Sequence, residues 1–81
     1  MRIDIYSKDN CPFCTKAFIL AQKIQKESSQ QNHTMSIYKL DRDFTREELM
    51  EKFPGAKTFP QIMIDKKVIG GYQEFEAWYN D

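Results

Sequence analysis

The chain's two cysteines are separated by two residues in the run Cys11-Pro12-Phe13-Cys14, where a strand-like pattern gives way to a helix-like one. Before this run, residues 2–7 alternate apolar and polar side chains, as a half-buried strand does. After it, small and apolar residues recur at helical spacing to about residue 27. Cys-x-x-Cys at a strand-to-helix junction is typical of a redox site. We therefore expect the chain to fold so that it positions these two sulfurs.

The position of each cysteine predicts a different role for it. Pro12 suits a first helical position, so Cys11 would lie at the helix N-terminus with Cys14 one turn later on the same face. Unpaired N–H groups and the helix dipole favour an anion there, which should lower the thiol pKa of Cys11. Lys8 adds a positive charge nearby, and Cys14 should be more buried and more protonated. We predict that Cys11 attacks a disulfide and that Cys14 resolves the intermediate.

Two other uses of the cysteine pair fit the sequence less well. A structural zinc site needs about four ligands. The chain offers two cysteines and His33, which we expect to be a solvated loop residue, so we predict no metal. A purely structural disulfide between Cys11 and Cys14 would close too small a loop to constrain the unfolded chain much.

Length and charge exclude several classes of protein. We expect residues 1–81 to form one small domain. Twelve basic residues balance twelve acidic ones, so nothing favours nucleic acid or an anionic membrane. The N-terminus lacks the continuous apolar stretch of a signal peptide, and the longest apolar run, residues 17–21, is too short to span a bilayer. We expect a cytoplasmic protein, where a cysteine pair is more often catalytic or metal-binding than structural.

The remaining pattern predicts a mixed sheet covered by helices. Residues 28–34 read as a polar loop, 35–40 as a strand, and 61–65 and 68–69 as two more strands joined by a turn at 66–67. Thr45 and Glu48 form a capping box, with Phe44 and Leu49 as its hydrophobic staple, for a helix that stops near Phe53. The order is then β-α-β-α-β-β-α, a parallel βαβ unit followed by a hairpin and a closing helix.

Two helices carry apolar side chains whose surroundings can be predicted. In the first helix, Phe18 and Ile19 widen the apolar surface beyond one stripe. We expect both to contact neighbouring elements, with a site for a partner as the less favoured alternative. In the last helix, predicted over residues 73–80, Phe75, Trp78 and Tyr79 have the i, i+3, i+4 spacing of a core-facing stripe.

The run Thr58-Phe59-Pro60 is a second candidate for function. A proline entering a buried strand is unusual, and a cis bond there would present the backbone of Phe59 to an extended peptide. An ordinary trans proline at a strand start is the alternative, and the residues alone favour it.

The run Gly70-Gly71-Tyr72-Gln73-Glu74 is a third candidate. Its glycines permit close backbone approach, and the helix start after them offers N–H groups to a carboxylate. Glu74 could accept a hydrogen bond from a ligand amine, although a plain strand-to-helix turn explains the glycines equally well.

Together the three runs resemble the glutaredoxin family, specifically its small bacterial-type dithiol members, along essentially the whole chain. The matching residues are Lys8, Cys11-Pro12-Phe13-Cys14, Thr58-Phe59-Pro60-Gln61-Ile62, Ile69-Gly70-Gly71-Tyr72, Phe75, Ala77 and Trp78. The resemblance implies a thioredoxin-like α/β fold, with three helices and a four-stranded mixed sheet in the order given above. It also implies a cis Pro60, no bound cofactor, and glutathione as co-substrate.

The resemblance further implies a glutathione site. Its residues would be Lys8, Phe13, Lys57, Thr58, Phe59, Pro60, Gly71, Tyr72, Gln73 and Glu74. The backbone of Phe59 would pair with the cysteinyl unit, the helix start at Gln73 and Glu74 would hold the γ-glutamyl end, and Lys8 or Lys57 would hold the glycyl carboxylate. The chain departs from the family at Phe13, where Tyr is usual, at Phe59, where Val is usual, and at Gln73-Glu74, where a Thr/Ser-Asp type pair is common.

These observations predict a monomeric, glutathione-dependent thiol–disulfide oxidoreductase with catalytic residues Cys11 and Cys14. Its substrates would be protein disulfides and glutathione mixed disulfides, and the resemblance suggests ribonucleotide reductase as an acceptor. One rival is a thioredoxin-type reductant fed by a reductase protein. Others are a glutathione-ligated iron–sulfur cluster carrier, against which Pro12 and Cys14 argue, and a non-catalytic docking module.

Overall fold

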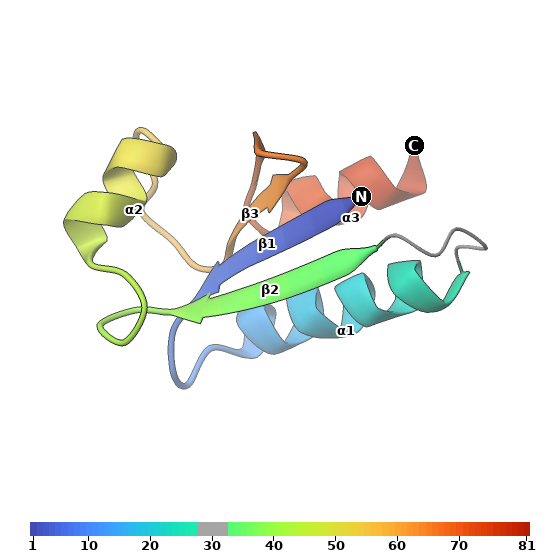
Figure 1. Ribbon diagram of the computed structural model, residues 1–81, viewed down its shortest axis with the longest axis horizontal. Helices are drawn as coiled ribbons and strands as arrows, with labels where there is room; N and C mark the ends of the chain where they lie inside the picture. Colours follow the sequence, from blue (N-terminus) through green and yellow to red (C-terminus); the bar gives the residue numbers. More distant parts are fainter. Residues whose placement is uncertain (28–32) are drawn as a thin grey trace.

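The computed structural model describes residues 1–27 and 33–81, and within these the elements follow the predicted order (Figure 1). They are β1 (Arg2–Ser7), α1 (Pro12–Glu27), β2 (Thr34–Lys39), α2 (Arg46–Lys52), β3 (Gln61–Ile64), β4 (Lys67–Gly70) and α3 (Tyr72–Asn80). The loop predicted at residues 28–34 lies largely outside the described residues, and Thr34 already belongs to β2.

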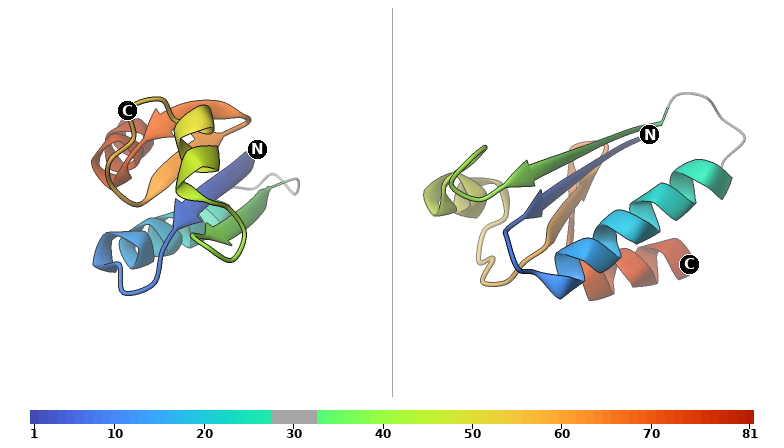
Figure 2. Two further views of the ribbon diagram at one scale, coloured as in Figure 1. Left: turned by 90° about the vertical axis from the view of Figure 1, so that its left-hand side faces the viewer. Right: turned by 90° about the horizontal axis from the view of Figure 1, so that it is seen from below.

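The four strands form one mixed sheet in the order β2-β1-β3-β4. Central β1 runs parallel to β2 and antiparallel to β3, so that Ile5 lies opposite both Ile37 and Ile62. β3 and β4 form the predicted antiparallel hairpin. Figure 2 shows α1 and α3 against one face of the sheet and α2 beyond one end of it. The predicted mixed sheet with three helices is confirmed.

The alternation in β1 separates two apolar clusters. Ile3 and Ile5 pack under α1 and α3 in the larger cluster, with Phe75 among its fully buried members. Tyr6 faces the other way and joins a mainly aromatic cluster with Phe44, Leu49 and Phe53 around α2. The predicted assignment of Ile3 and Ile5 to one face and Tyr6 to the other is confirmed. β1 is therefore covered on both faces, which holds its C-terminal end firmly where the chain turns towards Cys11.

The hairpin turn lies one residue earlier than predicted. Asp65 and Lys66 both adopt positive φ values, 51° and 67°. A two-residue hairpin turn with positive φ at both central positions matches the right-handed twist of its flanking strands. β4 consequently begins at Lys67 and is longer than the pattern of apolar residues indicated.

Two predicted burials are wrong. Trp78 stacks against Phe75 with ring centroids 6.0 Å apart, but it remains 37% exposed because Phe75 already fills the space between α3 and the sheet. Ile19 is 58% exposed rather than packed against a neighbouring element, because Ala17, Leu20, Ala21 and Ile24 form the face of α1 that meets the sheet. Phe18 is half-buried, as expected for a side chain at the edge of that face.

Candidate active site

The cysteine pair lies where the loop after β1 enters α1. Cys11 and Cys14 form a disulfide with their Cα atoms 5.2 Å apart. Cys11 directly precedes the helix and its carbonyl accepts the N–H of Thr15, so it occupies the N-cap position. The backbone N–H of Cys14 points at Cys11 Sγ, 3.2 Å away. The first turn thus brings a hydrogen-bond donor to the sulfur that was predicted to attack.

The two sulfurs differ in exposure as predicted. Cys11 is partly exposed, whereas Cys14 is only 7% exposed. A disulfide partner can therefore approach Cys11 more easily than Cys14. This asymmetry supports the assignment of Cys11 as the attacking group.

An ion pair connects the end of β2 with the loop that leads into α1. Lys39 Nζ lies 2.9 Å from Asp9 Oδ1, and this hydrogen bond, followed by the charge of Lys39, lowers the pKa of Asp9. Asn10 has a positive φ of 53°, which Asn tolerates better than most residues. Asp9 and Asn10 are the two residues immediately before Cys11, so the ion pair and the positive φ both lie in the loop that leads to it.

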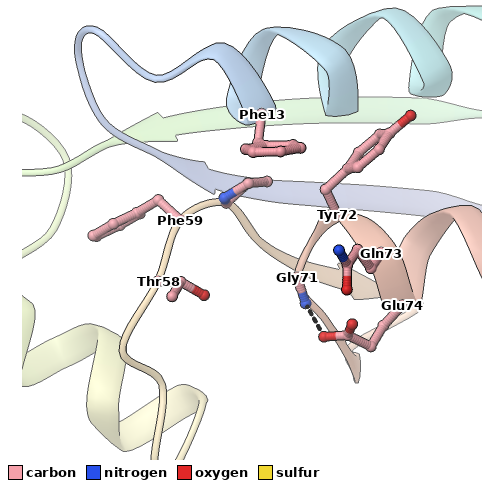
Figure 3. A pocket seen from close by; sticks show the side chains of 8 residues that line it. Phe13, Thr58, Phe59, Gly71, Tyr72, Gln73 and Glu74 are labelled. Atoms are coloured by element: carbon pink, nitrogen blue, oxygen red, sulfur yellow. Dashed lines mark hydrogen bonds between the residues drawn. The ribbon is translucent and has the colours of Figure 1, made fainter.

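A pocket of about 280 Å³ opens beside the cysteine loop (Figure 3). Its lining residues are Phe13, Thr58, Phe59, Pro60, Gly71, Tyr72, Gln73 and Glu74. The rings of Phe13 and Tyr72 form one wall, with centroids 5.9 Å apart. Eight of the ten residues predicted for the ligand site therefore line a single pocket.

The other two predicted site residues lie outside this pocket. Lys8 lines a second hollow, of about 240 Å³, which also borders Cys11 and Cys14. Its Nζ is 5.7 Å from the centroid of the Phe59 ring, so it approaches the pocket from the side of the loop before β3. Lys57 lines a further hollow together with Pro54 and Gly55.

The loop before β3 contains the cis bond that the family resemblance implied. The Phe59–Pro60 peptide bond is cis, so the trans form that the residues alone favoured is wrong. No short-range pattern distinguishes the two isomers, because their energies differ little for a bond to proline. The Gln61 side-chain amide donates to the carbonyl of Thr58 at 2.9 Å and ties the loop to β3.

The side chain of Phe59 turns away from Tyr72 and Gln73 in Figure 3. It packs against the aromatic cluster, 6.3 Å from Phe44 between ring centroids. Arg46 lies 5.9 Å from its centroid, on a ring that Lys8 also approaches. The larger ring at this position is therefore accommodated partly by α2, and it gathers two cations near the pocket.

The elbow before α3 uses its two glycines differently. Gly70 has a φ of +124°, and a Cβ there would lie 3.0 Å from the side chain of Glu74. Gly71 has an ordinary extended backbone, and its N–H donates to Glu74 Oε1 at 3.0 Å. Glu74 thus caps the start of its own helix, next to the position predicted for a ligand amine (Figure 3).

Sequence reasoning missed two cations at the site. Besides Arg46, Lys16 lies with its Nζ 4.9 Å from the centroid of the Phe13 ring. Lys16 follows Phe13 by three residues on a predicted helix, so the i, i+3 rule could have placed it there. Arg46 reaches Phe59 across the fold, and no local signal predicts that contact.

The tyrosine in the pocket wall is held by a carboxylate. The Tyr72 hydroxyl donates to Glu76 Oε2 at 3.2 Å. Burial and then this hydrogen bond raise the pKa of Tyr72, so the phenol stays protonated through the neutral range. The ring is thereby anchored on α3 one turn away from its own backbone.

Two candidate features are not found in the described part of the chain. Among residues 1–27 and 33–81, no three His, Cys, Asp or Glu side chains are arranged to hold a metal ion. No helix within the same ranges is long and apolar enough to cross a membrane.

Comparison with known proteins identifies the family. The glutaredoxin family model matches residues 3–69. The chain is 32% identical to glutaredoxin 1 of Escherichia coli (strain K12), an alignment that covers 100% of this chain and 95% of that protein. It is 38% identical to glutaredoxin 1 of Salmonella typhimurium (strain LT2), with 91% of this chain and 85% of that protein covered.

Solved structures agree with the sequence comparison. Reduced E. coli glutaredoxin superposes with a TM-score of 0.83 at 32% identity, covering 99% of this chain and 94% of that one. The oxidised form of that protein gives a TM-score of 0.84 at 29% identity, with 100% and 95% covered. The thioredoxin-like fold is therefore confirmed.

The fold and the Cys11–Cys14 pair define a thiol–disulfide oxidoreductase. The chain belongs to the glutaredoxin family.

Proposed function

We propose that this protein is a glutathione-dependent oxidoreductase that reduces protein disulfides and glutathione mixed disulfides. The observation that carries the proposal is the pocket beside the cysteine loop, which joins Phe13, the loop before β3 and the start of α3. The volume of this pocket, about 280 Å³, approaches that of small-ligand sites. It can therefore hold part of a tripeptide such as glutathione.

Each part of the pocket offers a group that fits one unit of glutathione. The backbone of Phe59 can pair with the extended cysteinyl unit as an added strand does. The N-terminus of α3 offers N–H groups to the γ-glutamyl carboxylate, while Glu74 can accept from the adjoining amine. Lys8 and Arg46, at the ring of Phe59, supply positive charge for the glycyl carboxylate, and Lys57 is a third candidate.

The first half-reaction reduces the substrate. The Cys11 thiolate attacks one sulfur of a disulfide, forms a mixed disulfide and releases the other sulfur as a thiolate. Cys14, as a thiolate, then attacks Cys11 Sγ, which forms the Cys11–Cys14 disulfide and releases the second substrate thiolate. Two electrons have passed from the dithiol to the substrate, leaving the disulfide form seen in this structure.

The second half-reaction restores the dithiol. One glutathione thiolate attacks Cys11 Sγ, which forms a mixed disulfide and releases the Cys14 thiolate. A second glutathione thiolate attacks the glutathione sulfur of this mixed disulfide and releases the Cys11 thiolate with oxidised glutathione. When a glutathione mixed disulfide is the substrate, the Cys11 thiolate attacks its glutathione sulfur and releases the substrate thiolate. A glutathione thiolate then attacks the same glutathione sulfur, releasing the Cys11 thiolate and oxidised glutathione, so Cys14 is not required.

The wider setting of the reaction is part of the same proposal. Oxidised glutathione would be returned to its thiol form by an NADPH-dependent reductase. We propose a monomer acting in a reducing cytoplasm, with ribonucleotide reductase as one candidate protein acceptor. Glutathione enters as a co-substrate rather than as a resident cofactor.

A glutathione-coupled assay on wild type, Cys11→Ser and Cys14→Ser tests the proposal. We expect no turnover by Cys11→Ser on any disulfide. Cys14→Ser should keep activity on glutathione mixed disulfides and lose most of it on protein disulfides, because only the latter need the second sulfur. Full activity of Cys11→Ser would overturn the assignment of the nucleophile. Failure of glutathione to reduce the wild-type disulfide would overturn the dependence on glutathione.

A further inference from the structure

A separate hollow, of about 590 Å³, runs between α1 and α3 and extends away from the proposed glutathione site, with which it shares Phe13, Tyr72 and Gln73. The two helices lie side by side on one face of the sheet (Figure 2). Side chains from one stripe of each helix form its walls. They include Phe13, Lys16, Ile19 and Lys23 from α1, and Tyr72, Gln73, Glu76 and Tyr79 from α3. We call this hollow the α1–α3 groove.

The groove is continuous with the pocket beside the disulfide. Phe13, Tyr72 and Gln73 line both hollows. The paired rings of Phe13 and Tyr72 therefore stand at the junction between them. A polypeptide whose cysteine reaches Cys11 can pass over these rings and continue along the groove.

Two large apolar side chains that line the groove are exposed to water. Phe13 is 49% exposed and Ile19 is 58% exposed. Neither belongs to the face of α1 that packs on the sheet, which includes Ala17 and Ala21. Two large apolar side chains left in water on one helix stripe, and lining a hollow, are typical of a contact surface. An apolar side chain of a partner would cover Ile19 and remove both surfaces from water.

The charges along the groove favour an acidic partner. The α1 wall carries Lys16 and Lys23, whose Nζ atoms lie 4.9 Å from the centroid of the Phe13 ring and 5.4 Å from that of Tyr79. On the α3 wall, the carboxylate of Glu76 already accepts from the Tyr72 hydroxyl. Lys23 also lies 3.9 Å from Glu27, so Lys16 is the more available of the two ammonium groups.

We propose that the α1–α3 groove binds the chain of protein substrates beside their reactive cysteine. The preferred segment carries an apolar side chain, which rests on Ile19, and an acidic side chain, which pairs with Lys16 or Lys23. This inference rests on the proposed function, because it names the substrate class of the same cysteine pair. Small disulfides end at Phe13 and Tyr72 and do not reach the groove, so the groove discriminates between the two kinds of substrate.

The test compares two substrates on two matched variants. The peptide substrate has one glutathionylated cysteine with Leu and Glu residues on both sides, and the small substrate is glutathionylated free cysteine. The variants are Ile19→Glu in the groove and Met50→Glu on α2. Met50 is 55% exposed and Ile19 is 58% exposed, so each substitution replaces a large apolar side chain by a carboxylate at a similarly exposed helix position.

We expect Ile19→Glu to lower kcat/KM for the peptide about tenfold, equivalent to about 1.4 kcal/mol, and to leave the small substrate unaffected. Met50→Glu should change neither. An unchanged peptide rate for Ile19→Glu would overturn the proposal, and so would an equal loss on both substrates. A wild type inactive on both substrates would instead show that the proposed function itself fails, and the inference would fall with it.

A charge exchange tests the acidic preference separately. Each kcat/KM is divided by that of the same variant for the small substrate. On this scale, Lys16→Glu should have a lower kcat/KM than wild type for the acidic peptide, and a higher one than wild type for a peptide with Lys in place of Glu. Lys26→Glu, on the same helix but outside the groove, is the control. Absence of the exchange would overturn the electrostatic part. A wild-type dimer that Ile19→Glu dissociates would show that a second copy occupies the groove and would overturn substrate docking.

Discussion

The N-termini of α1 and α2 each have a hydrogen bond between the N-cap side chain and the N–H of the third helical residue, but the surrounding charges differ. In each, the backbone N–H of the third helical residue lies 3.2 Å from the side chain of the N-cap residue, Cys14 to Cys11 Sγ in α1 and Glu48 to Thr45 Oγ1 in α2. In α2 the capping box is closed, because the Glu48 carboxylate accepts the N–H of Thr45 at 3.0 Å. In α1 the third residue is Cys14, and residues 12–15 include no acid.

This difference separates a structural helix start from a reactive one. The carboxylates of Glu47 and Glu48 already occupy the positive end of the α2 dipole. In α1 the sulfur of Cys11 takes up this position, where the helix end would favour a thiolate once the disulfide is reduced. At the start of α3, Glu74 accepts the N–H of Gly71, but the N-cap glycine has no side chain to accept from the N–H groups of the first turn. Of these three helices, only the one bearing the cysteines leaves its N-terminal N–H groups to a sulfur.

The largest expected effect is the loss of activity in Cys11→Ser, a variant that should keep the helix cap. Cys11→Ser keeps a side chain that caps a helix well and removes the nucleophile. We expect turnover to fall to the uncatalysed rate. The free energy of unfolding, measured by urea denaturation of reduced proteins, should stay within about 0.5 kcal/mol of wild type. A larger loss of stability would mean that the sulfur does more for the helix than a hydroxyl can.

The next effect is the reverse, a loss of stability without a loss of chemistry. Thr45→Ala removes the acceptor for the N–H of Glu48 and opens the capping box of α2. We expect the free energy of unfolding to fall by about 1 kcal/mol, with kcat/KM on a small glutathione mixed disulfide unchanged.

Thr15→Ala is the matched control for this prediction. The Thr15 hydroxyl lies 3.5 Å from the carbonyl of Cys11, which is long for a hydrogen bond. We therefore expect Thr15→Ala to lower the free energy of unfolding clearly less than Thr45→Ala does. Equal losses of stability for the two variants would contradict the difference between the two helix starts.

A smaller effect should follow from giving α1 the kind of charge that α2 has. Thr15→Glu places a carboxylate in the first turn, where it competes with the Cys11 thiolate for the positive helix end. We expect the thiol to titrate at higher pH and to react with a neutral alkylating reagent about two- to fivefold more slowly near neutral pH, as an effect of about 0.3–1 kcal/mol implies. Thr15→Gln supplies the same shape without the charge and should react like wild type. A faster reaction of Thr15→Glu would contradict the electrostatic argument.

The smallest effect concerns the loops that lead into the two helices. Lys39 joins them, because its side chain pairs with Asp9 before α1 and its backbone N–H donates to Asp43 before α2. The hydrogen bond from Lys39 lowers the pKa of each carboxyl below its ordinary value of 3.8. Since both pKa values fall on folding, these groups stabilise the folded state above pH 3.8, and this contribution disappears as pH decreases through the folded values.

Carboxyl titration followed by NMR, together with acid unfolding of Asp43→Asn, checks this prediction. Both carboxyls should titrate below 3.8, and Asp43→Asn should lose less stability than wild type as pH decreases through that range. A titration midpoint above 3.8 for either residue would contradict it.

Local patterns predicted most of the fold for identifiable physical reasons. The alternation of Ile3, Ile5 and Tyr6 assigned the two faces of β1, because successive strand residues point to opposite sides. The capping box and staple around Thr45 marked α2 to within a residue, because they act within one helical turn. The burial of Trp78 and Ile19 was wrong, because helical spacing does not say how wide the covered face will be.

The candidate site was predictable in its members more than in its geometry. Phe13, Thr58 and Tyr72 could be named from the sequence through the family resemblance, and the structure places them around one pocket. The direction of the Phe59 ring and the approach of Arg46 to it could not be named, since they depend on where α2 packs. The hydrogen bond from the N–H of Gly71 to the Glu74 carboxylate is different, because it joins residues three apart and a capping pattern at the helix start could have predicted it.

The sequence by itself determined the reactive unit of this protein. The two sulfurs lie three residues apart at a helix start that has no acid in its first turn. Their proximity and their position at the positive end of the helix depend only on short-range geometry and on the helix dipole. Only the tertiary structure decided what lies beside that unit. The pocket and the α1–α3 groove both form where α3, from the end of the chain, packs beside α1 from its beginning. Contacts between such distant segments follow from the filling of a shared core, which no local pattern encodes.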